Sequence, residues 1–387
     1  MAKLGDICTF YSGTGFPIKY QGANTGRYPF YKVGDIAKNV MQGFTVLSLC
    51  DNYIDDDVCL AIKGVIVPEN TVVFAKIGEA VKLNRRAITN QACLIDNNVM
   101  GIKPNECITD LHYFYHYMCC LKLEEHAEAT TVPSIKKTVV EKIDIPLPSL
   151  EVQHQIAATL DKVTHLIDLC KQQLETLDLL VKSRFIELFR NYDLSAQCSN
   201  WQRIDEIGVV IGGATPKTNI ADYWNGEYLW ITPAELSDDT GYIFDSVRKI
   251  TKLGIESCSL QEIPKGTVIL TSRAPIGKLA IAGSKMYCNQ GFKNIICREK
   301  IIPRYLYNLL LYNVNYLNSL GRGATFKEIS KKIVESILIP VPSLALQEQF
   351  AAFVETTDKS KFVINYELLQ LTDIKDHFCR RFYHDKL

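Results

Sequence analysis

Side chains that can form several directed hydrogen bonds gather in two stretches of the sequence, each bordered by strand-like apolar segments. The first stretch contains Lys76, Lys82, Asn84, Arg85, Arg86, Asn90 and Gln91. The second contains Thr271, Ser272, Arg273, Lys278, Asn289, Gln290 and Lys293. Arg, Lys, Asn and Gln pair with base edges in a DNA groove, and Lys, Arg, Ser and Thr bond to phosphates. Both stretches therefore predict nucleic-acid contact; the alternative is an ordinary solvated loop.

A third group of cations lies at or beside residues 129–143 and 323–337. Its members are Lys136, Lys137, Arg322, Lys327, Lys331 and Lys332. The neighbouring Gly321 and Gly323 would let backbone approach a phosphate closely. These residues are further candidates for DNA contact, and the alternative is the solvated face of a helix.

The elements that would position these side chains occur in two copies. Residues 145–160 read IPLPSLEVQHQIAATL, and residues 339–354 read IPVPSLALQEQFAAFV. Before the first copy, strands are predicted at 28–33, 71–75, 87–89 and 92–95, and a helix at 109–123. After residue 200 the same framework returns, with 4–7 opposite 204–207, 12–14 opposite 212–214 and Asn90-Gln91 opposite Asn289-Gln290. The pattern predicts two related α+β domains.

Each proline-rich phrase leads into a long heptad pattern. The first seam is Ile156, Leu160, Val163, Ile167, Cys170, Leu174, Leu177 and Val181. The second is Phe350, Val354, Thr357, Lys361, Ile364, Leu368, Leu371, Lys375, Phe378 and Phe382. Each pattern predicts a helix of about 60 Å. Together with the internal repeat, the two patterns predict an antiparallel coiled coil with a pseudo-twofold axis and a domain at each end. The alternative is that each helix packs only on its own domain.

Composition narrows the class of protein. Lys+Arg and Asp+Glu both number 43, which argues against a simple polycationic nucleic-acid binder and suggests help from partner subunits. No apolar run reaches the roughly 18 residues of a membrane span, and residues 1–13 do not resemble a secretory signal, so we expect no membrane and a cytoplasmic location. The thirteen cysteines lack zinc-ligand spacing and are predicted to be reduced thiols.

The two proline-rich phrases with their long helices, and the openings GTGFP (13–17) and GATPK (213–217), resemble the specificity subunit of a type I restriction–modification system. The resemblance covers nearly the whole chain. It implies two target-recognition domains that each read half of a bipartite double-stranded DNA target, and two helical spacers that dock methyltransferase subunits. It also implies two modification subunits per chain, two restriction subunits for cleavage, methylation at adenine N6, and S-adenosylmethionine bound by the modification subunit.

Catalytic signatures are missing from the sequence. Adenine-N6 methyltransferases require an Asn/Asp-Pro-Pro-aromatic motif, and the chain has no Pro-Pro pair. Residues 12–15 lack the strand–GxGxxG–helix setting of a cofactor loop, and Gly277-Lys278 is followed by Leu279, not by the Ser or Thr of a P-loop. We therefore expect no catalytic residue, no metal and no cofactor in this chain.

Glutamines recur at the first turns of the two long helices: Gln153, Gln155, Gln347 and Gln349. A coiled-coil seam does not need them. Surface glutamines beside apolar residues suit a protein–protein contact, which the resemblance identifies as the modification subunit. The alternative is solvation of the helix N-terminus.

The sequence thus predicts a non-catalytic DNA-reading subunit and scaffold in five parts. These are a first target-recognition domain (1–147), a first spacer helix (148–190), a linker (191–200), a second target-recognition domain (201–341) and a second spacer helix (342–387). Two alternatives remain: an interaction scaffold without DNA sequence preference, and an autonomous DNA methyltransferase.

Overall fold

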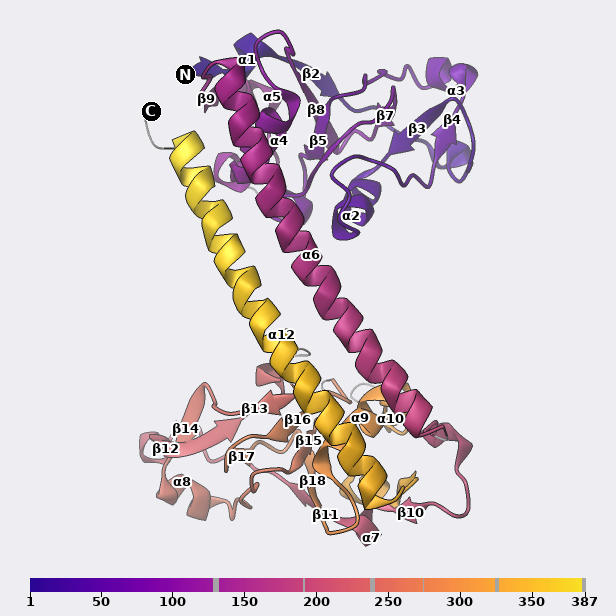
Figure 1. The fold of residues 1–387 in the computed structure, drawn as a ribbon, viewed down its shortest axis with the longest axis vertical. Helices are drawn as coiled ribbons and strands as arrows, with labels where there is room; N and C mark the ends of the chain where they lie inside the picture. The colour runs from indigo at the N-terminus through magenta and orange to yellow at the C-terminus, as the bar shows by residue number, and fades with distance from the viewer. Residues whose placement is uncertain (128–131, 191, 237–240, 274, 324–326, 385–387) are drawn as a thin grey trace. The chain divides into compact units, whose positions relative to one another are not determined.

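The computed structural model describes residues 1–127, 132–190, 192–236, 241–273, 275–323 and 327–384. The chain forms two compact units, one of residues 1–174 with 363–387 and the other of residues 175–362. Two long helices, α6 (Leu150–Leu188) and α12 (Leu344–Cys379), contribute to both units (Figure 1). Each unit therefore combines a globular domain with part of each long helix.

The first unit contains a four-stranded sheet and a three-stranded sheet, flanked by short helices. Its antiparallel four-stranded sheet has the order β2 (Cys8–Ser12), β8 (Val99–Pro104), β5 (Val72–Ala75), β6 (Arg86–Ile88). Its three-stranded sheet has the order β4 (Tyr53–Ile54), β3 (Tyr28–Tyr31), β7 (Leu94–Ile95). The helices are α1 (Leu4–Ile7), α2 (Val33–Met41), α3 (Asp56–Ala61), α4 (Leu111–Cys120) and α5 (Lys137–Val140).

The second unit repeats this plan with one more strand. Its larger sheet has the order β11 (Gly208–Gly212), β18 (Lys293–Cys297), β15 (Val268–Leu270), β16 (Leu279–Ala282), β13 (Tyr242–Ile243). Its smaller sheet has the order β14 (Arg248–Ile250), β12 (Trp224–Ile231), β17 (Tyr287–Cys288). The helices are α7 (Ile204–Ile207), α8 (Lys252–Ser257), α9 (Pro303–Tyr312), α10 (Val314–Ser319) and α11 (Lys331–Ser336).

The proline-rich phrases close each domain in the same manner. A two-stranded ribbon joins the start of the domain to its end, β1 (Ala2–Lys3) with β9 (Asp144–Ile145) and β10 (Gln202–Arg203) with β19 (Leu338–Ile339). Tyr113 of α4 donates its hydroxyl hydrogen to the Pro146 carbonyl at 2.7 Å, and Tyr305 of α9 does the same to Pro340 at 2.9 Å. The predicted internal repeat is confirmed.

The predicted helical seam is also confirmed, because every heptad position is buried or half-buried. In the first unit, Ile156 and Leu160 near the start of α6 share a core with Cys379 and Tyr383 at the end of the chain. In the second unit, Phe185 near the end of α6 packs on Phe350 near the start of α12, with ring centroids 5.2 Å apart. The helices are therefore antiparallel, as predicted.

A polar position in this seam has a specific partner. Lys361 of α12 forms an ion pair with Asp178 of α6 inside the second unit. This pair satisfies a charge where the heptad pattern calls for an apolar residue.

Two of the thirteen cysteines differ from the sequence prediction. Cys120 at the end of α4 and Cys379 at the end of α12 form a disulfide in the first unit, across a sequence separation of 259. The expectation of reduced thiols throughout is wrong for this pair. The other cysteines are free, and most of them are buried or half-buried, as expected for small core side chains.

Candidate nucleic-acid interface

The first predicted stretch lies on and beside β6, and part of it is internal. Arg86 is 2% exposed, its guanidinium lies 4.9 Å from the Phe74 ring centroid, and burial lowers its pKa to about 10. Asn84 accepts a hydrogen bond from Arg86 at 2.6 Å and donates one to the Cys119 carbonyl at 2.7 Å. These two residues brace β6 against α4. Burial sets Arg86 aside as a DNA contact, whereas the half-buried Asn84 stays a prediction.

The remaining members of this stretch reach the surface. Lys82, Asn90 and Gln91 are exposed, and Lys76 and Arg85 are half-buried. Lys82 pairs with Glu79 at 2.8 Å in the turn that follows β5. These five stay candidates for DNA contact.

The second predicted stretch separates in the same way into supports and exposed groups. Thr271 and Ser272 are fully buried. Thr271 donates to the Pro275 carbonyl at 2.7 Å and accepts from the Lys278 N–H at 2.9 Å, which closes the loop between β15 and β16. Lys278 donates to the Leu236 carbonyl at 2.9 Å. Thr271 and Ser272 therefore hold the loop and are not accessible to DNA, contrary to the prediction.

Three other members of the second stretch line one cleft, whereas Lys278 and Lys293 do not and stay predictions. Arg273, Asn289 and Gln290 line a space of about 550 Å³ together with Gly291 and residues 232–234. The structure thus brings together side chains from the loop after β15 and from the turn after β17, which the sequence predicted only as one broad region.

A carboxylate pins the cations beside this cleft. Glu328 Oε2 lies 3.4 Å from Arg273 Nη1, and its Oε1 lies 3.5 Å from Lys293 Nζ. Lys293 also lies 3.3 Å from the Ser272 hydroxyl. The Glu328 backbone pairs with both Arg273 and Arg322 in isolated antiparallel bridges. The third predicted region therefore lies against the loop after β15.

The corresponding position in the first unit has the same backbone and different side chains. Ile77, after β5, forms an antiparallel bridge with Ser134, as Arg273 does with Glu328. Ile77 therefore occupies the place of Arg273, and an apolar side chain stands where the second unit has a guanidinium.

The third region also carries cations that the structure leaves at the surface. Lys136, Lys137, Arg322, Lys327, Lys331 and Lys332 are all exposed. Lys137 pairs with Glu141 at 3.5 Å, and Lys331 pairs with Glu335 at 3.7 Å, each along one short helix. Exposed pairs of this kind contribute little to stability, so both lysines can also meet a phosphate. Residues 129–131 and 324–326 of this prediction lie outside the described residues.

Strand pairing corrects the predicted match between the two Asn-Gln pairs. In the first unit Tyr31 of β3 lies opposite Ile95 of β7, and in the second unit Ile231 of β12 lies opposite Cys288 of β17. Residue 289 therefore corresponds to residue 96. The predicted correspondence of Asn289-Gln290 with Asn90-Gln91 is wrong, because it needs an offset of 199 residues, whereas Ile95 and Cys288 are 193 residues apart.

The corrected match reveals a shared turn with different chemistry. Asn289 Oδ1 accepts a hydrogen bond from the Gly291 N–H at 2.8 Å, and Asp96 Oδ1 accepts one from the Asn98 N–H at 2.8 Å. The turn is the same in both units. At this position the second unit therefore carries the amide of Asn289, and the first unit carries the carboxylate of Asp96.

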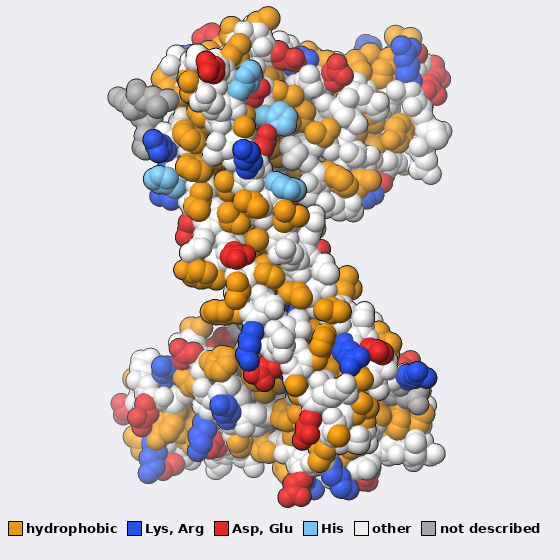
Figure 2. Space-filling view, viewed as in Figure 1, with side chains coloured by type: hydrophobic (Ala, Val, Ile, Leu, Met, Phe, Trp, Pro, Cys, Tyr) orange, Lys and Arg blue, Asp and Glu red, His pale blue; other side chains and the backbone are white. Residues whose placement is uncertain are grey.

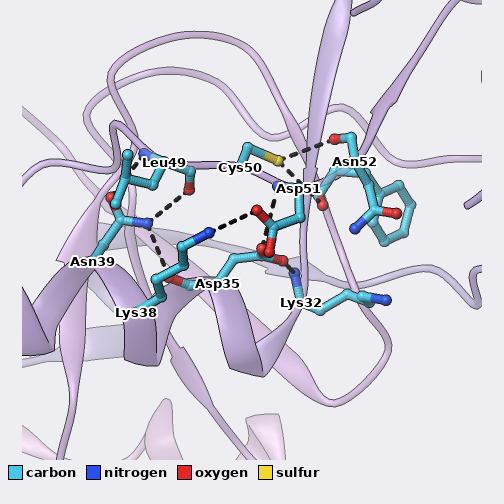
Figure 3. A network of polar contacts seen from close by, with 9 residues as sticks. Lys32, Asp35, Lys38, Asn39, Leu49, Cys50, Asp51 and Asn52 are labelled. Carbon is cyan, nitrogen blue, oxygen red and sulfur yellow. Dashed lines mark hydrogen bonds and ion pairs between the residues drawn. The ribbon is translucent and has the colours of Figure 1, made fainter. Parts of the chain in front are cut away.

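The opposite wall of the cleft begins with a capping box, and the first unit has a capping box at the equivalent place. In the second unit Glu235 Oε1 accepts from the Thr232 N–H at 2.8 Å, which fixes the loop that follows β12. In the first unit Asp35 Oδ2 accepts from the Lys32 N–H at 2.7 Å after β3, within the network drawn in Figure 3. Each capping box satisfies a backbone N–H at a helix start, and the one in the second unit fixes the backbone beside cleft residues 232–234.

Two of the four predicted docking glutamines are internal. Gln153 is fully buried, accepts from the Asp110 N–H at 2.9 Å and donates to the Ile108 and Pro148 carbonyls. Gln347 repeats this set. It accepts from the Ile302 N–H at 2.8 Å and donates to the Lys300 and Pro342 carbonyls.

The docking prediction is therefore wrong for Gln153 and Gln347, which join each domain to its helix. Gln155 and Gln349 are exposed on the same first turns and stay candidates. Residues two apart on a helix point in different directions, so the two glutamines of each phrase could not both face the solvent on one surface.

The long helices also expose apolar side chains within each unit (Figure 2). In the first unit Tyr366 and Leu369 of α12 are 57% and 66% exposed. In the second unit Leu179 of α6 and Phe362 of α12 are 64% and 75% exposed. Such residues lie off the seam, where a water-exposed coiled coil normally carries polar side chains.

Metal and membrane sites do not add to this picture. The described ranges contain no group of three or more His, Cys, Asp or Glu side chains arranged to hold a metal ion. None of the described helices is long and apolar enough to cross a bilayer.

Comparison with known proteins places this architecture in a family. A family model described as "Type I restriction modification DNA specificity domain" matches residues 1–179 and 199–371. The MjaIX type I restriction enzyme specificity subunit of Methanocaldococcus jannaschii is 39% identical over 184 residues, which is 46% of this chain and 43% of that protein. The MjaVIII specificity subunit of the same organism is 23% identical over 397 residues, covering 92% of this chain and 85% of that protein.

Solved structures share the fold. The S subunit of the type I restriction–modification system of M. genitalium aligns with a TM-score of 0.57 at 16% identity, covering 100% of this chain and 96% of that one. The family match covers both domains and most of both long helices. The chain therefore belongs to the type I restriction–modification specificity-subunit family, as a DNA-recognition subunit.

Proposed function

We propose that this chain reads a bipartite double-stranded DNA target, with one half-site for each domain, and that it performs no chemistry itself. The observation that carries the proposal is the pair of equivalent sites at Arg273 and Ile77. Ile77 and Arg273 form the same kind of antiparallel bridge in their units, and their side chains differ. A duplicated framework with exchanged polar groups suits two readers of different sequences.

Phosphate contacts would come from the exposed cations of the third region, which border both reading sites. Such contacts fix the register of a protein on DNA without reading its sequence. The chain's zero formal net charge keeps this term small. Stable binding then needs more positive charge from partner subunits.

The long helices are the proposed docking surface for methyltransferase subunits. Gln155 and Gln349 lie exposed beside the domain-joining turns, and each unit has exposed apolar residues on its part of α6 and α12. Exposed apolar residues rimmed by polar ones mark protein–protein contacts. Because the surface occurs twice, we propose two modification subunits for each chain, with two restriction subunits added for cleavage.

The reaction assigned to these partners is methyl transfer to adenine N6. S-adenosylmethionine belongs to the modification subunit in this proposal, because the present chain lacks the Pro-Pro motif of such enzymes. The purified chain alone, given S-adenosylmethionine and target DNA, should then transfer no methyl groups.

The docking proposal is tested by coexpressing the chain with its modification subunit and measuring the mass of the assembled complex. The double variant Tyr366→Ser, Leu369→Ser should lose bound modification subunit while the free chain stays folded. The matched control, Asp373→Ser, changes another exposed residue of α12 that is not apolar. Retention of full assembly by the double variant would contradict the helical docking surface.

The DNA-reading proposal is tested by mapping methylated adenines in the genome of cells with and without this gene. The expected result is a motif of two specified parts with an unread gap, lost on deletion and restored by the intact gene. A scaffold without sequence preference would leave the methylated motif unchanged after deletion.

A further inference from the structure

The cleft in the second unit is built to present hydrogen-bond donors. Arg273 enters from the loop after β15, and Asn289 and Gln290 enter from the turn after β17. The oxygen of Asn289 is already bonded to the Gly291 N–H, and the oxygen of Gln290 accepts from the Thr215 hydroxyl at 2.5 Å. Among the described residues neither NH₂ group donates a hydrogen bond, so both keep their hydrogens for a ligand.

Arg273 is held in place and only partly satisfied. Glu328 engages its Nη1 at 3.4 Å, and its side chain remains 38% exposed. Within the described part of the chain, the other guanidinium nitrogens form no hydrogen bond. An arginine oriented by a neighbouring carboxylate can present its remaining planar donors to two acceptors at once.

The shape of the cleft favours a flat ligand edge over a bare phosphate. Pro233 and Ala234 form an apolar wall, held by the Glu235 cap described above. A Cβ atom at Gly291 would lie 3.1 Å from Pro233 Cγ and 3.0 Å from Asn289 Oδ1, so the glycine keeps the space between wall and turn free. Phosphate-binding cations need no such wall, and exposed ones stand outside the cleft in the third region.

We propose that Arg273 reads a guanine in the half-site of the second domain, a role that rests on the proposed function. Guanine presents two adjacent acceptors, O6 and N7, in the major groove, and an arginine fork bonds to both. Asn289 and Gln290 add donors at the flanks of the same site. Glu328 supplies orientation and limits the affinity of Arg273 for phosphates.

The first unit reads differently at the equivalent place. Ile77 stands in place of Arg273, and Asp96 stands in place of Asn289, so a carboxylate acceptor replaces an amide donor. A carboxylate accepts a hydrogen bond from cytosine N4 and repels the acceptor edge of guanine. The two half-sites therefore differ at the position that these sites read.

The test uses the complete complex of this chain with its modification subunits and a library of duplexes in which every position of both half-sites is varied. Arg273→Lys keeps the charge and removes the fork, and Arg273→Gln removes both. The expected result is relaxed preference at one guanine of the second half-site, with discrimination reduced about 5- to 140-fold. All other positions stay as in the wild type.

The matched control is Ile77→Gln, at the equivalent place of the first unit, which should leave the second half-site unchanged. Tryptophan fluorescence of Trp224 and Trp230 confirms that the second unit of each variant is folded. If Arg273→Gln unfolds that unit, Arg273→Lys alone decides the outcome.

Two results would overturn the inference. One is an unchanged preference at every position of the second half-site in a folded variant. The other is an equal loss of methylation on all duplexes with no relaxed position, which would make Arg273 a phosphate contact. Failure of the proposed function itself looks different, because the wild-type complex would then show no bipartite preference.

Discussion

The buried glutamine at the start of α12 should control the stability of the second unit. Gln347→Ala removes three hydrogen bonds that join a fully buried side chain to backbone groups. A net contribution of about 1 kcal/mol for each bond predicts that the free energy of unfolding falls by about 3 kcal/mol. Gln153→Ala should cost the first unit a similar amount, because it removes the equivalent three bonds.

The placement of tryptophan makes this prediction easy to measure. All three tryptophans, Trp201, Trp224 and Trp230, lie in residues 175–362, so their fluorescence reports unfolding of the second unit. With a urea m value of about 2 kcal/mol/M, Gln347→Ala should lower the tryptophan midpoint by about 1.5 M. Gln153→Ala should shift the circular-dichroism transition of the first unit and leave the tryptophan midpoint in place.

The control is Gln349→Ala, two residues further along the same helix and exposed. Its effect should stay within about 0.5 kcal/mol, as for most surface substitutions. The reasoning is refuted if Gln347→Ala leaves the tryptophan midpoint unchanged, or if Gln349→Ala shifts it equally.

Three further predictions concern the first unit and the helices. Cys379→Ser, or a reductant, should lower the free energy of unfolding of the first unit by about 2 to 5 kcal/mol. In chemical denaturation the circular-dichroism transition of the first unit should then move, while the tryptophan midpoint of the second unit stays in place. Burial lowers the pKa of His116, so the folded unit binds fewer protons than the unfolded chain and loses stability as pH falls below about 6.5. Tyr113 and Tyr305 are equivalent, so Asn308 of the second unit corresponds to His116. His116→Asn should therefore be tolerated and should flatten this loss in melting curves between pH 7 and 5. One heptad inserted into each long helix at the unit boundary lengthens that helix by about 10 Å. The unread gap should then widen by about three base pairs, with both half-sites unchanged. Mapping of methylated adenines would reveal the new gap.

Features that depend on local periodicity were predictable from the sequence. The 4-3 spacing from Ile156 to Val181 specifies which face of α6 is buried, whatever the partner. The match of residues 4–7 with 204–207 was found because the same apolar pattern occurs twice; that both segments are short helices is a finding of the structure. The proline-rich phrases marked the ends of both domains for the same reason.

Features that depend on long-range contacts were not predictable. Gln153 is buried because three backbone groups of its own domain need partners, and nothing in the adjacent sequence shows that need. Arg86 resembles a DNA-contacting residue in sequence, but the ring of Phe74 and the oxygen of Asn84 enclose it. The partner of Cys120 lies 259 residues away, and loops of unequal length hid the match of Asn289 with Asp96.

The central claim is that each domain reads its own half of one DNA target. It is tested most directly by replacing residues 201–341 with the second domain of a relative of different specificity and mapping methylated adenines across the genome. The account predicts that one half of the methylated motif changes while the other half and the gap persist. A change in both halves, or in neither, would contradict it.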